Sequence, residues 1–306
     1  QVDEPALRVL AHRMMGVPLH FCGELSVAVE HLEQVVRLYD FGRDRESALV
    51  YGTDSKAASL SILSQSLFAL GQSDRALAVA RQAVDHAQGI AHFHSIAHAL
   101  AQLAGVHLLR REPESALEEA KRAMDLSEQH ALGMQYEVAR ALVGAALVDL
   151  DKASEGTALI RGSLRDGERI GLRIARASKL RRLAAAAAQM RQWDEAAGYL
   201  DEALDEADVS GERWYEAELH RSKGEFLLER GDVAAPAQAE ICFVESLGVA
   251  RAQGARAWEL RTSTSLARLW QSQGKRKEAR DLLKPVYGWF TEGFDTKDLK
   301  EAKALL

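Results

Sequence analysis

Residues 104–120 read AGVHLLRREPESALEEA, and this order of small residue, turn and small residue recurs along the chain. An apolar-periodic segment leads into the turn string Arg111–Glu114, and a second such segment follows it. Ala104 lies seven residues before the turn, and Ala116 lies five residues after its first residue. The pattern predicts two helices joined by a short turn, with their backbones close together where the small residues meet.

Seven copies of this unit are found, and they align in columns. The column after the turn holds Ala28, Ala76, Ala116, Gly156, Ala196, Ala239 and Ala279, spaced by 48, 40, 40, 40, 43 and 40 residues. The column before the turn holds Gly16, Ser64, Ala104, Gly144, Ala184, Gly224 and Ala267. A third column, four residues after the first, holds Leu32, Ala80, Ala120, Ile160, Leu200, Phe243 and Leu283. Larger side chains in the two small columns would separate the helices of a hairpin, so these columns mark the crossings.

The columns follow the helix–turn–helix pattern of a tetratricopeptide repeat (TPR), whose usual period is about 34 residues. Here the period is near 40, so each hairpin is longer by about one and a half helical turns. We therefore predict an all-α, TPR-like superhelix that forms one domain over residues 1–306. The expected hairpins are 6–41, 53–88, 92–130, 133–170, 173–208, 212–253 and 256–290, with a capping helix at 296–306. The extra residues around Phe41–Gly52 are the one expected hinge.

Composition excludes several classes of protein. The 306 residues are 47% hydrophobic, which excludes general disorder, and the net charge of −6 argues against a dedicated nucleic-acid binder. The two cysteines, Cys22 and Cys242, are expected to be buried free thiols in a reducing cytoplasm. No signal peptide or membrane span is recognised, so we expect a cytoplasmic protein without a membrane partner. Because residue 1 is Gln, we expect the chain to begin inside a longer protein.

Several stretches resemble a known family more closely than a generic repeat does. They are Tyr51–Asp54, Trp214–Arg221, Ala250–Trp270 and Pro285–Thr296. They resemble the C-terminal TPR region of bacterial adenylate/guanylate cyclase–STAND ATPase regulators, most strongly from about residue 213 onwards. In that family a cyclase or DNA-binding domain precedes a predicted ATPase and then the helical array. The resemblance implies a regulatory arm, since Gly274-Lys275 is followed by Arg276 and no phosphate-binding loop is present.

The concave, helix-A surface of such an array is the expected binding surface. Projecting the columns places on it Arg13, His20, Phe21, Ser61, Gln65, Phe68, His98, Leu108, Val138, Asp149, Arg181, Gln189, Glu218, Arg221, Glu225, Arg261 and Arg268. From these we select as candidate partner-binding residues Gln65, Phe68, His98, Arg181, Glu218, Arg221, Arg261 and Arg268. Small residues in the middle hairpins leave room for a peptide, a domain segment or a small amphipathic effector. The alternative is that these small residues only permit tight curvature.

Histidines are dense between His86 and His107, and His94 and His98 stand four apart, as on one helix face. A zinc ion would need further ligands that no cysteine or second motif supplies. Catalysis would need an activated partner and a pocket, neither of which the sequence displays. We therefore predict no metal, no cofactor and no catalytic residue.

Two further clusters each allow two interpretations. A basic ladder at helical spacing is expected to be a solvated face, with docking of an acidic surface as the alternative; it comprises Arg161, Arg165, Arg169, Arg173 and Arg176, extended by Arg181 and Arg182. Trp289, Phe290 and Phe294 follow the last repeat, and capping of its apolar end is favoured over self-association.

These observations together predict a non-enzymatic interaction or sensor scaffold, the C-terminal TPR arm of a larger signalling regulator. Its expected partner is a protein or peptide segment, including the missing N-terminal domains of the same polypeptide, and not a nucleic acid. The alternative is a small-molecule effector sensor. An enzyme with an unrecognised site is the third hypothesis.

Overall fold

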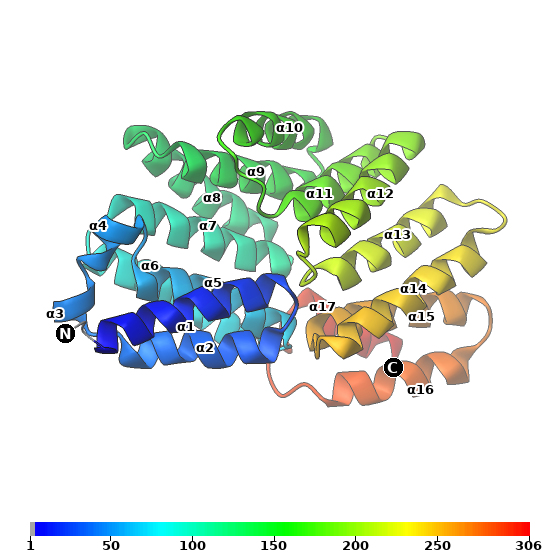
Figure 1. Ribbon diagram of the computed structural model, residues 1–306. Coiled ribbons are helices and arrows are strands. Elements are labelled where there is room, and N and C mark those ends of the chain that lie inside the picture. Colours follow the sequence, from blue (N-terminus) through cyan, green and yellow to red (C-terminus); the bar gives the residue numbers. More distant parts are fainter. Residues whose placement is uncertain (1–3) are drawn as a thin grey trace. The chain divides into compact units, whose positions relative to one another are not determined.

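The computed structural model describes residues 4–306, and every regular element in that range is a helix (Figure 1). The predicted all-α, TPR-like fold is confirmed. Antiparallel helix pairs follow one another along the chain, and we call the first helix of each pair helix A and the second helix B. The helix A and helix B pairs are α1 (Glu4–Phe21) and α2 (Leu25–Leu38), α5 (Ser55–Ala69) and α6 (Ser73–Gly89), α7 (Phe93–Leu109) and α8 (Pro113–Gln129), α9 (Gly133–Asp149) and α10 (Ala153–Arg169), α11 (Arg176–Gln189) and α12 (Trp193–Ser210), α13 (Glu216–Arg230) and α14 (Ala235–Ala252), and α15 (Arg256–Ser272) and α16 (Arg276–Gly288).

Three short helices lie outside these pairs. The segment expected to be a hinge forms α3 (Phe41–Asp44) and α4 (Ser47–Tyr51), and α17 (Lys297–Leu305) follows the last pair. In α3, the Asp40 side chain accepts a hydrogen bond from the Arg43 backbone N–H, which caps the helix N-terminus. The segment is thus locally ordered, and its role as a hinge stays a prediction.

The chain divides into two compact units. The first comprises Gln1–Phe68 and Asp74–Ile174, and the second comprises Ala69–Ser73 and Ala175–Leu306. Each has its own apolar clusters: one in the first unit joins buried residues of α5, α6 and α7, and one in the second unit joins α13, α14 and α15. A single domain over 1–306 therefore remains a prediction.

The small-residue columns lie at close helix crossings, as predicted. A Cβ atom added to Gly144 would lie 2.7 Å from Ile160 Cγ1, and one added to Gly224 would lie 2.5 Å from Phe243 Cε1. Because these distances are far below van der Waals contact, a side chain at either glycine would push helix A away from helix B. The third column therefore supplies the large residue that fills the space left by the small residues of the column before the turn.

The turns between helices share one device even where glycine is missing. Arg111, Asp151 and Arg191 each have a positive φ, between 58° and 63°, at the position that ends helix A. At the first of these, Glu112 N–H donates to His107 O at 2.9 Å and Arg111 N–H donates to Leu108 O at 3.1 Å. This paired pattern satisfies the last carbonyl groups of helix A and reverses the chain into helix B.

Helix α17 covers the apolar end of the last pair. Leu299 and Ala302 are buried against an apolar cluster that also contains Leu260, Leu283 and Phe290. Phe290, 7% exposed, therefore contributes to capping as predicted. Trp289, by contrast, is 44% exposed, with the Arg256 guanidinium 5.3 Å from its ring centre.

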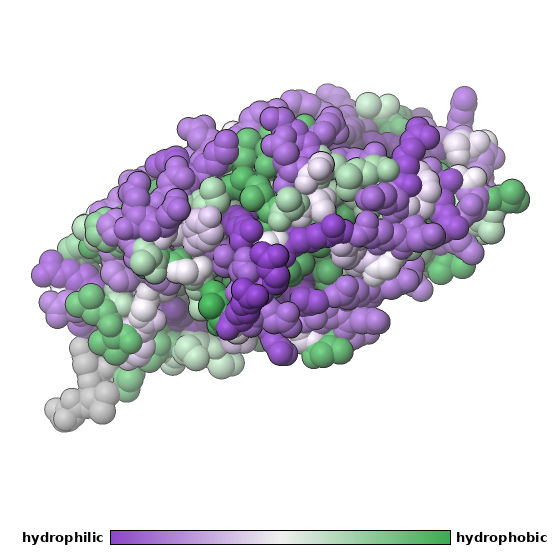
Figure 2. Space-filling view, turned by 90° about the horizontal axis from the view of Figure 1, so that it is seen from above, coloured by the Kyte–Doolittle hydropathy of each residue, from purple (hydrophilic) through white to green (hydrophobic). Residues whose placement is uncertain are grey.

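One expectation about the cysteines is wrong. Cys242 is buried, which raises the pKa of its thiol, but Cys22 is exposed because it lies in the turn after α1 and not on a helix face. Among the described residues, no helix is both long and apolar enough to cross a membrane. Figure 2 shows one face covered mainly by hydrophilic side chains, with small apolar patches between them.

Candidate functional site

A column of arginines marks the helix-A surface of the second unit. Arg181, Arg221 and Arg261 are 40 residues apart and hold the same position in α11, α13 and α15, which are consecutive neighbours. Arg268 lies about two turns further along α15. With Glu218, these are five of the eight residues selected from the sequence, and the structure brings them into one network.

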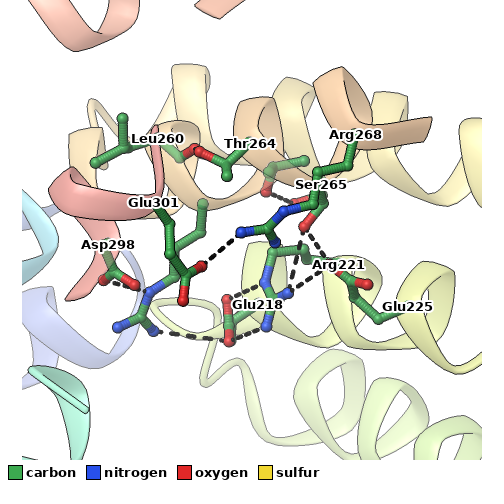
Figure 3. Close-up of polar contacts among 12 residues, drawn as sticks. Glu218, Arg221, Glu225, Leu260, Thr264, Ser265, Arg268, Asp298 and Glu301 are labelled. Carbon is green, nitrogen blue, oxygen red and sulfur yellow. Dashed lines mark hydrogen bonds and ion pairs between the residues drawn. The ribbon is translucent and has the colours of Figure 1, made fainter. Parts of the chain in front are cut away.

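Glu218 is the centre of this network (Figure 3). Its side chain is 3% exposed and accepts two hydrogen bonds from Arg221, from Nε at 2.8 Å and from Nη2 at 2.7 Å. Arg261 Nη1 lies 3.7 Å from Glu218 Oε1. Burial alone would raise the pKa of Glu218, but the charge and hydrogen bonds of Arg221, with the charges of Arg261 and Arg181, lower that pKa to about 2. The carboxylate is therefore ionised at neutral pH.

The network continues onto α15 and α17. Arg221 Nη1 donates to Glu225 Oε1 at 3.3 Å, and the Ser265 hydroxyl donates to the same carboxylate. Arg261 Nε donates to Asp298 Oδ2 at 2.7 Å, and Arg268 Nη2 donates to Glu301 Oε2 at 2.7 Å (Figure 3). The helices α13, α15 and α17 are thus joined by charged hydrogen bonds as well as by apolar packing.

Asp298 and Glu301 were missed as candidate site residues. Glu301 lies 40 residues after Arg261, so the repeat period itself placed it in the arginine column. The change from arginine to glutamate at the end of the column could have indicated a partner for the preceding helix.

Aromatic rings support two of the arginines. The Arg261 guanidinium lies 5.1 Å from the ring centre of the buried Trp258, and that of Arg181 lies 5.7 Å from the ring centre of Tyr215. The rings of Tyr215 and Trp258 meet edge to face at 5.4 Å, and Trp258 Nε1 donates to Trp214 O at 3.1 Å. The guanidinium groups are therefore held in position before any partner arrives.

The other three selected residues lie in the first unit. Gln65 Nε2 donates a hydrogen bond to Gln102 Oε1 on α7. Phe68 is only 2% exposed, so its ring packs inside the unit and does not reach the surface. His98 is half-buried, and burial together with the charges of His94 and Arg13 lowers its pKa to about 4, so its imidazole is neutral at pH 7. Their role in partner binding stays a prediction.

The histidines of the first unit hold separate places. His86 Nε2 lies 2.9 Å from Asp54 Oδ1, and His107 Nδ1 lies 2.7 Å from Glu112 Oε2. His94 lies between Thr53 and Gln135: its Nδ1 is 3.1 Å from Thr53 Oγ1, and its Nε2 is 3.3 Å from Gln135 Nε2. Within residues 4–306, no group of three or more histidine, cysteine or acidic side chains is placed to hold a metal ion.

The basic ladder agrees with a solvated face. Arg165 and Arg169 are exposed and lie 3.1 Å and 3.5 Å from Asp166. In the second unit Arg176 pairs with Glu202 at 2.6 Å and with Glu206 at 3.2 Å. Each of these three arginines thus has an acidic neighbour, as on an ordinary solvated face.

The second-unit network is a fixed array of charged groups. It contains four arginines and four carboxylates, and Arg268 is 45% exposed at its edge. Such an arrangement presents both hydrogen-bond donors and acceptors in fixed positions, which lowers the entropy lost on binding a partner.

No family model and no curated protein matches this sequence. Solved structures do match its fold. A Rap protein complexed with competence and sporulation factor superposes with a TM-score of 0.67 and 14% identity, over 98% of this chain and 77% of that one. NprR in complex with its cognate peptide NprX superposes with a TM-score of 0.63 and 12% identity, over 100% of this chain and 84% of NprR. Aspartyl phosphate phosphatase F from Bacillus subtilis superposes with a TM-score of 0.58 and 14% identity, over 93% of this chain and 70% of the phosphatase. At these identities the similarity is one of fold, and it defines the class as TPR-like repeat proteins.

Proposed function

We propose that this protein is a non-enzymatic scaffold that binds a peptide or protein segment on the helix-A surface of its second unit. We further propose that it is the TPR arm of a larger bacterial signalling regulator, of the cyclase or transcription-factor type with an ATPase module. The observation that carries the binding proposal is the arginine column on α11, α13 and α15, whose guanidinium groups are fixed by carboxylates and aromatic rings.

The physical reason is preorganisation. A long arginine side chain normally loses rotamer freedom when it binds a partner, and this loss weakens binding. Here Arg221 and Arg261 are already ordered by Glu218 and Asp298, while Arg268 reaches the solvent at the edge. A segment carrying both an acidic and an amide group can therefore bind without ordering these side chains first. Two of the proteins with a similar fold are described in complex with a factor or a peptide, which supports this type of ligand.

The test selects random peptides against the whole chain by surface display and then measures their affinities for two variants. Arg268→Ala removes an exposed guanidinium from the network, and Arg280→Ala removes an exposed arginine from α16, a helix B. We expect selected peptides to bind Arg268→Ala at least about fivefold more weakly and Arg280→Ala with unchanged affinity, since a charged hydrogen bond contributes about 1.5–3 kcal/mol when fully shielded and less at an edge.

Two outcomes would contradict the proposal. One is that no peptide binds the folded protein, and the other is that both variants bind as tightly as the parent. Circular dichroism of each variant shows that the comparison concerns folded protein.

A further inference from the structure

One helix B differs from the other six on the side that it presents to solvent. This helix is α14, the second helix of the sixth pair (Figure 1). Its exposed side carries Ala237, Ile241, Val244 and Gly248, which we call the α14 stripe, and the exposed fractions of Ile241 and Val244 are 60% and 56%. A Cβ added to Gly248 meets no atom within 4 Å, so no other part of the described chain covers that end of the stripe.

The stripe is apolar where the other helices B are charged. Val244 lies five residues after Ala239, the member of the column after the turn. The same offset in the other copies gives Glu33, Arg81, Lys121, Arg161, Asp201 and Lys284. A charged residue suits the solvent-facing side of a helix, whereas a row of uncharged residues there is typical of a contact surface. The valine therefore marks α14 as a helix that contacts a partner outside the described chain.

The spacing of the stripe indicates that this partner is another helix. Its members follow one another at steps of four, three and four residues, and Arg251 follows Gly248 after three more. Alternating steps of three and four residues keep a row on one side of a helix, and they are the pattern by which two helices pack along a common seam. An extended peptide would not need this period.

Two copies of the stripe match each other when the helices run in opposite directions. Ile241 and Val244 are equally far from the middle of the stripe, and so are Ala237 and Gly248. A two-fold axis through that middle therefore places Ile241 of one copy opposite Val244 of the other, and Ala237 opposite Gly248. The larger residues meet at the centre, and the small residues at both ends let the two backbones lie close together.

The charges beside the stripe agree with this pairing. Side chains on a helix lean toward its N-terminus, so Arg251 of one copy leans to the level of Glu240 of the other when the helices are antiparallel. The Arg251 side chain is 52% exposed, and Glu240 is held at the same edge of α14 by Trp270 Nε1, which donates to its Oε1 at 2.9 Å. The other flanking acid, Glu245, lies 3.2 Å from His220 Nδ1 on α13. The pairing thus brings two opposite charges together at each end.

We propose that α14 is a self-association surface, through which two copies of this chain pair in opposite directions with Arg251 of each beside Glu240 of the other. The inference goes beyond the proposed function, because it uses a helix-B surface and does not depend on peptide binding. One pair of helices buries less than the roughly 800 Å² per partner of a standard stable interface, so the dimer is expected to depend on concentration.

Sedimentation velocity of the whole chain over about a hundredfold range of concentration tests the association. Val244→Glu restores a charge at the position where the other helices B have one, and the residue is exposed, so the fold is retained. Val209→Glu on α12 makes the same change at another exposed valine of a helix B and is the matched control. We expect the parent and Val209→Glu to dimerise alike, and Val244→Glu to dimerise at least about tenfold more weakly, since the two-fold axis introduces the charge twice.

Cysteine cross-linking tests the direction of the pairing. Ala237→Cys and Gly248→Cys are prepared separately in a Cys22→Ser background, which removes the exposed native thiol. A mixture of the two should form a disulfide-linked dimer on mild oxidation. Neither variant should do so alone, because in the antiparallel pair two copies of the same residue lie about 16 Å apart, too far for a disulfide.

Three results would overturn the inference. A parent that sediments as a monomer at every concentration leaves the stripe to a helix of another protein, and equal dimerisation of Val244→Glu and the parent places the contact elsewhere. Cross-linking of Ala237→Cys with itself shows helices that run in the same direction. Peptide affinities for the helix-A surface are measured independently, so none of these results bears on the proposed function.

Discussion

Replacing Gly224 by alanine tests the close helix crossing on which the fold depends. In an exposed helix this change stabilises by about 1 kcal/mol, because alanine has the higher helix propensity. At Gly224, however, the new Cβ would lie 2.5, 2.8 and 2.9 Å from Cε1, Cδ1 and Cζ of Phe243. Phe243 is fully buried, so its ring cannot move into solvent, and overpacking of this kind costs about 1–3 kcal/mol. We expect a net loss of about 1–2 kcal/mol.

The matched control is Gly248→Ala on α14, the other helix of the same pair. A Cβ at Gly248 meets no atom within 4 Å, so this variant should gain about 0.5–1 kcal/mol. Urea denaturation followed by circular dichroism measures both, with the midpoint of unfolding as the readout. In the Phe243→Leu background the cost of Gly224→Ala should shrink, because the ring atoms that cause the clash are gone. Equal stabilisation by both alanines would refute the reasoning, and the small column would then need another cause.

Three further predictions follow from the second unit and the turns. Glu218→Gln should destabilise by about 3 kcal/mol, since it removes the buried carboxylate that accepts two hydrogen bonds from Arg221 and leaves this half-buried arginine with Glu225 as its remaining carboxylate. Because the pKa of Glu218 is lowered from 4.5 to about 2, the parent should lose this stabilisation as pH falls from about 4.5 to 2, and the variant should lose less, as urea midpoints across that range would reveal. Phe290→Ala should lower the thermal midpoint more than Trp289→Ala, because the Phe290 ring is almost fully buried whereas only about half of Trp289 is. Calorimetry of the two variants measures both midpoints. Ala131→Gly should raise stability by up to about 1 kcal/mol, because Ala131 has a φ of 54° that glycine adopts without strain; a lower urea midpoint would contradict this.

Much of the fold could be predicted because its determinants are local and periodic. Helix A and helix B of a pair touch at positions fixed by the turn, so Gly144 and Ile160 can be matched by counting residues. The left-handed residue that ends helix A was harder to recognise, since Arg111 and Asp151 stand where other copies have glycine. There the hydrogen bonds of the turn outweigh the conformational preference of the residue.

The site was predictable in position but not in pairing. Counting by 40 placed Arg181, Arg221 and Arg261 at one position of helix A, and the structure has them on α11, α13 and α15, whereas their role in binding stays a prediction. The sequence could not indicate that Phe68 is buried, because a residue at the border of the helix-A surface is covered or exposed according to the rotation of its neighbours. The same limit applies to Cys22, whose exposure depends on the path of a turn.

The hydrogen-bond acceptors of the column's arginines differ between the two units, and the repeat period alone does not predict this difference. Arg221 has its closest carboxylate contact with Glu218, one turn earlier on its own helix, whereas Arg261 pairs with Asp298 on α17. At the corresponding offset of three residues before Arg13, the chain has Leu10, and the position on α5 that corresponds to Asp298 holds Ala58. Arg13 instead donates to the neutral acceptors Thr53 O and Ser55 Oγ, and Asp54 is the acid whose charge opposes the lowering of its pKa. The repeat period therefore fixes the place of each arginine, whereas its acceptors depend on residues at other offsets, in the same helix or in a later one.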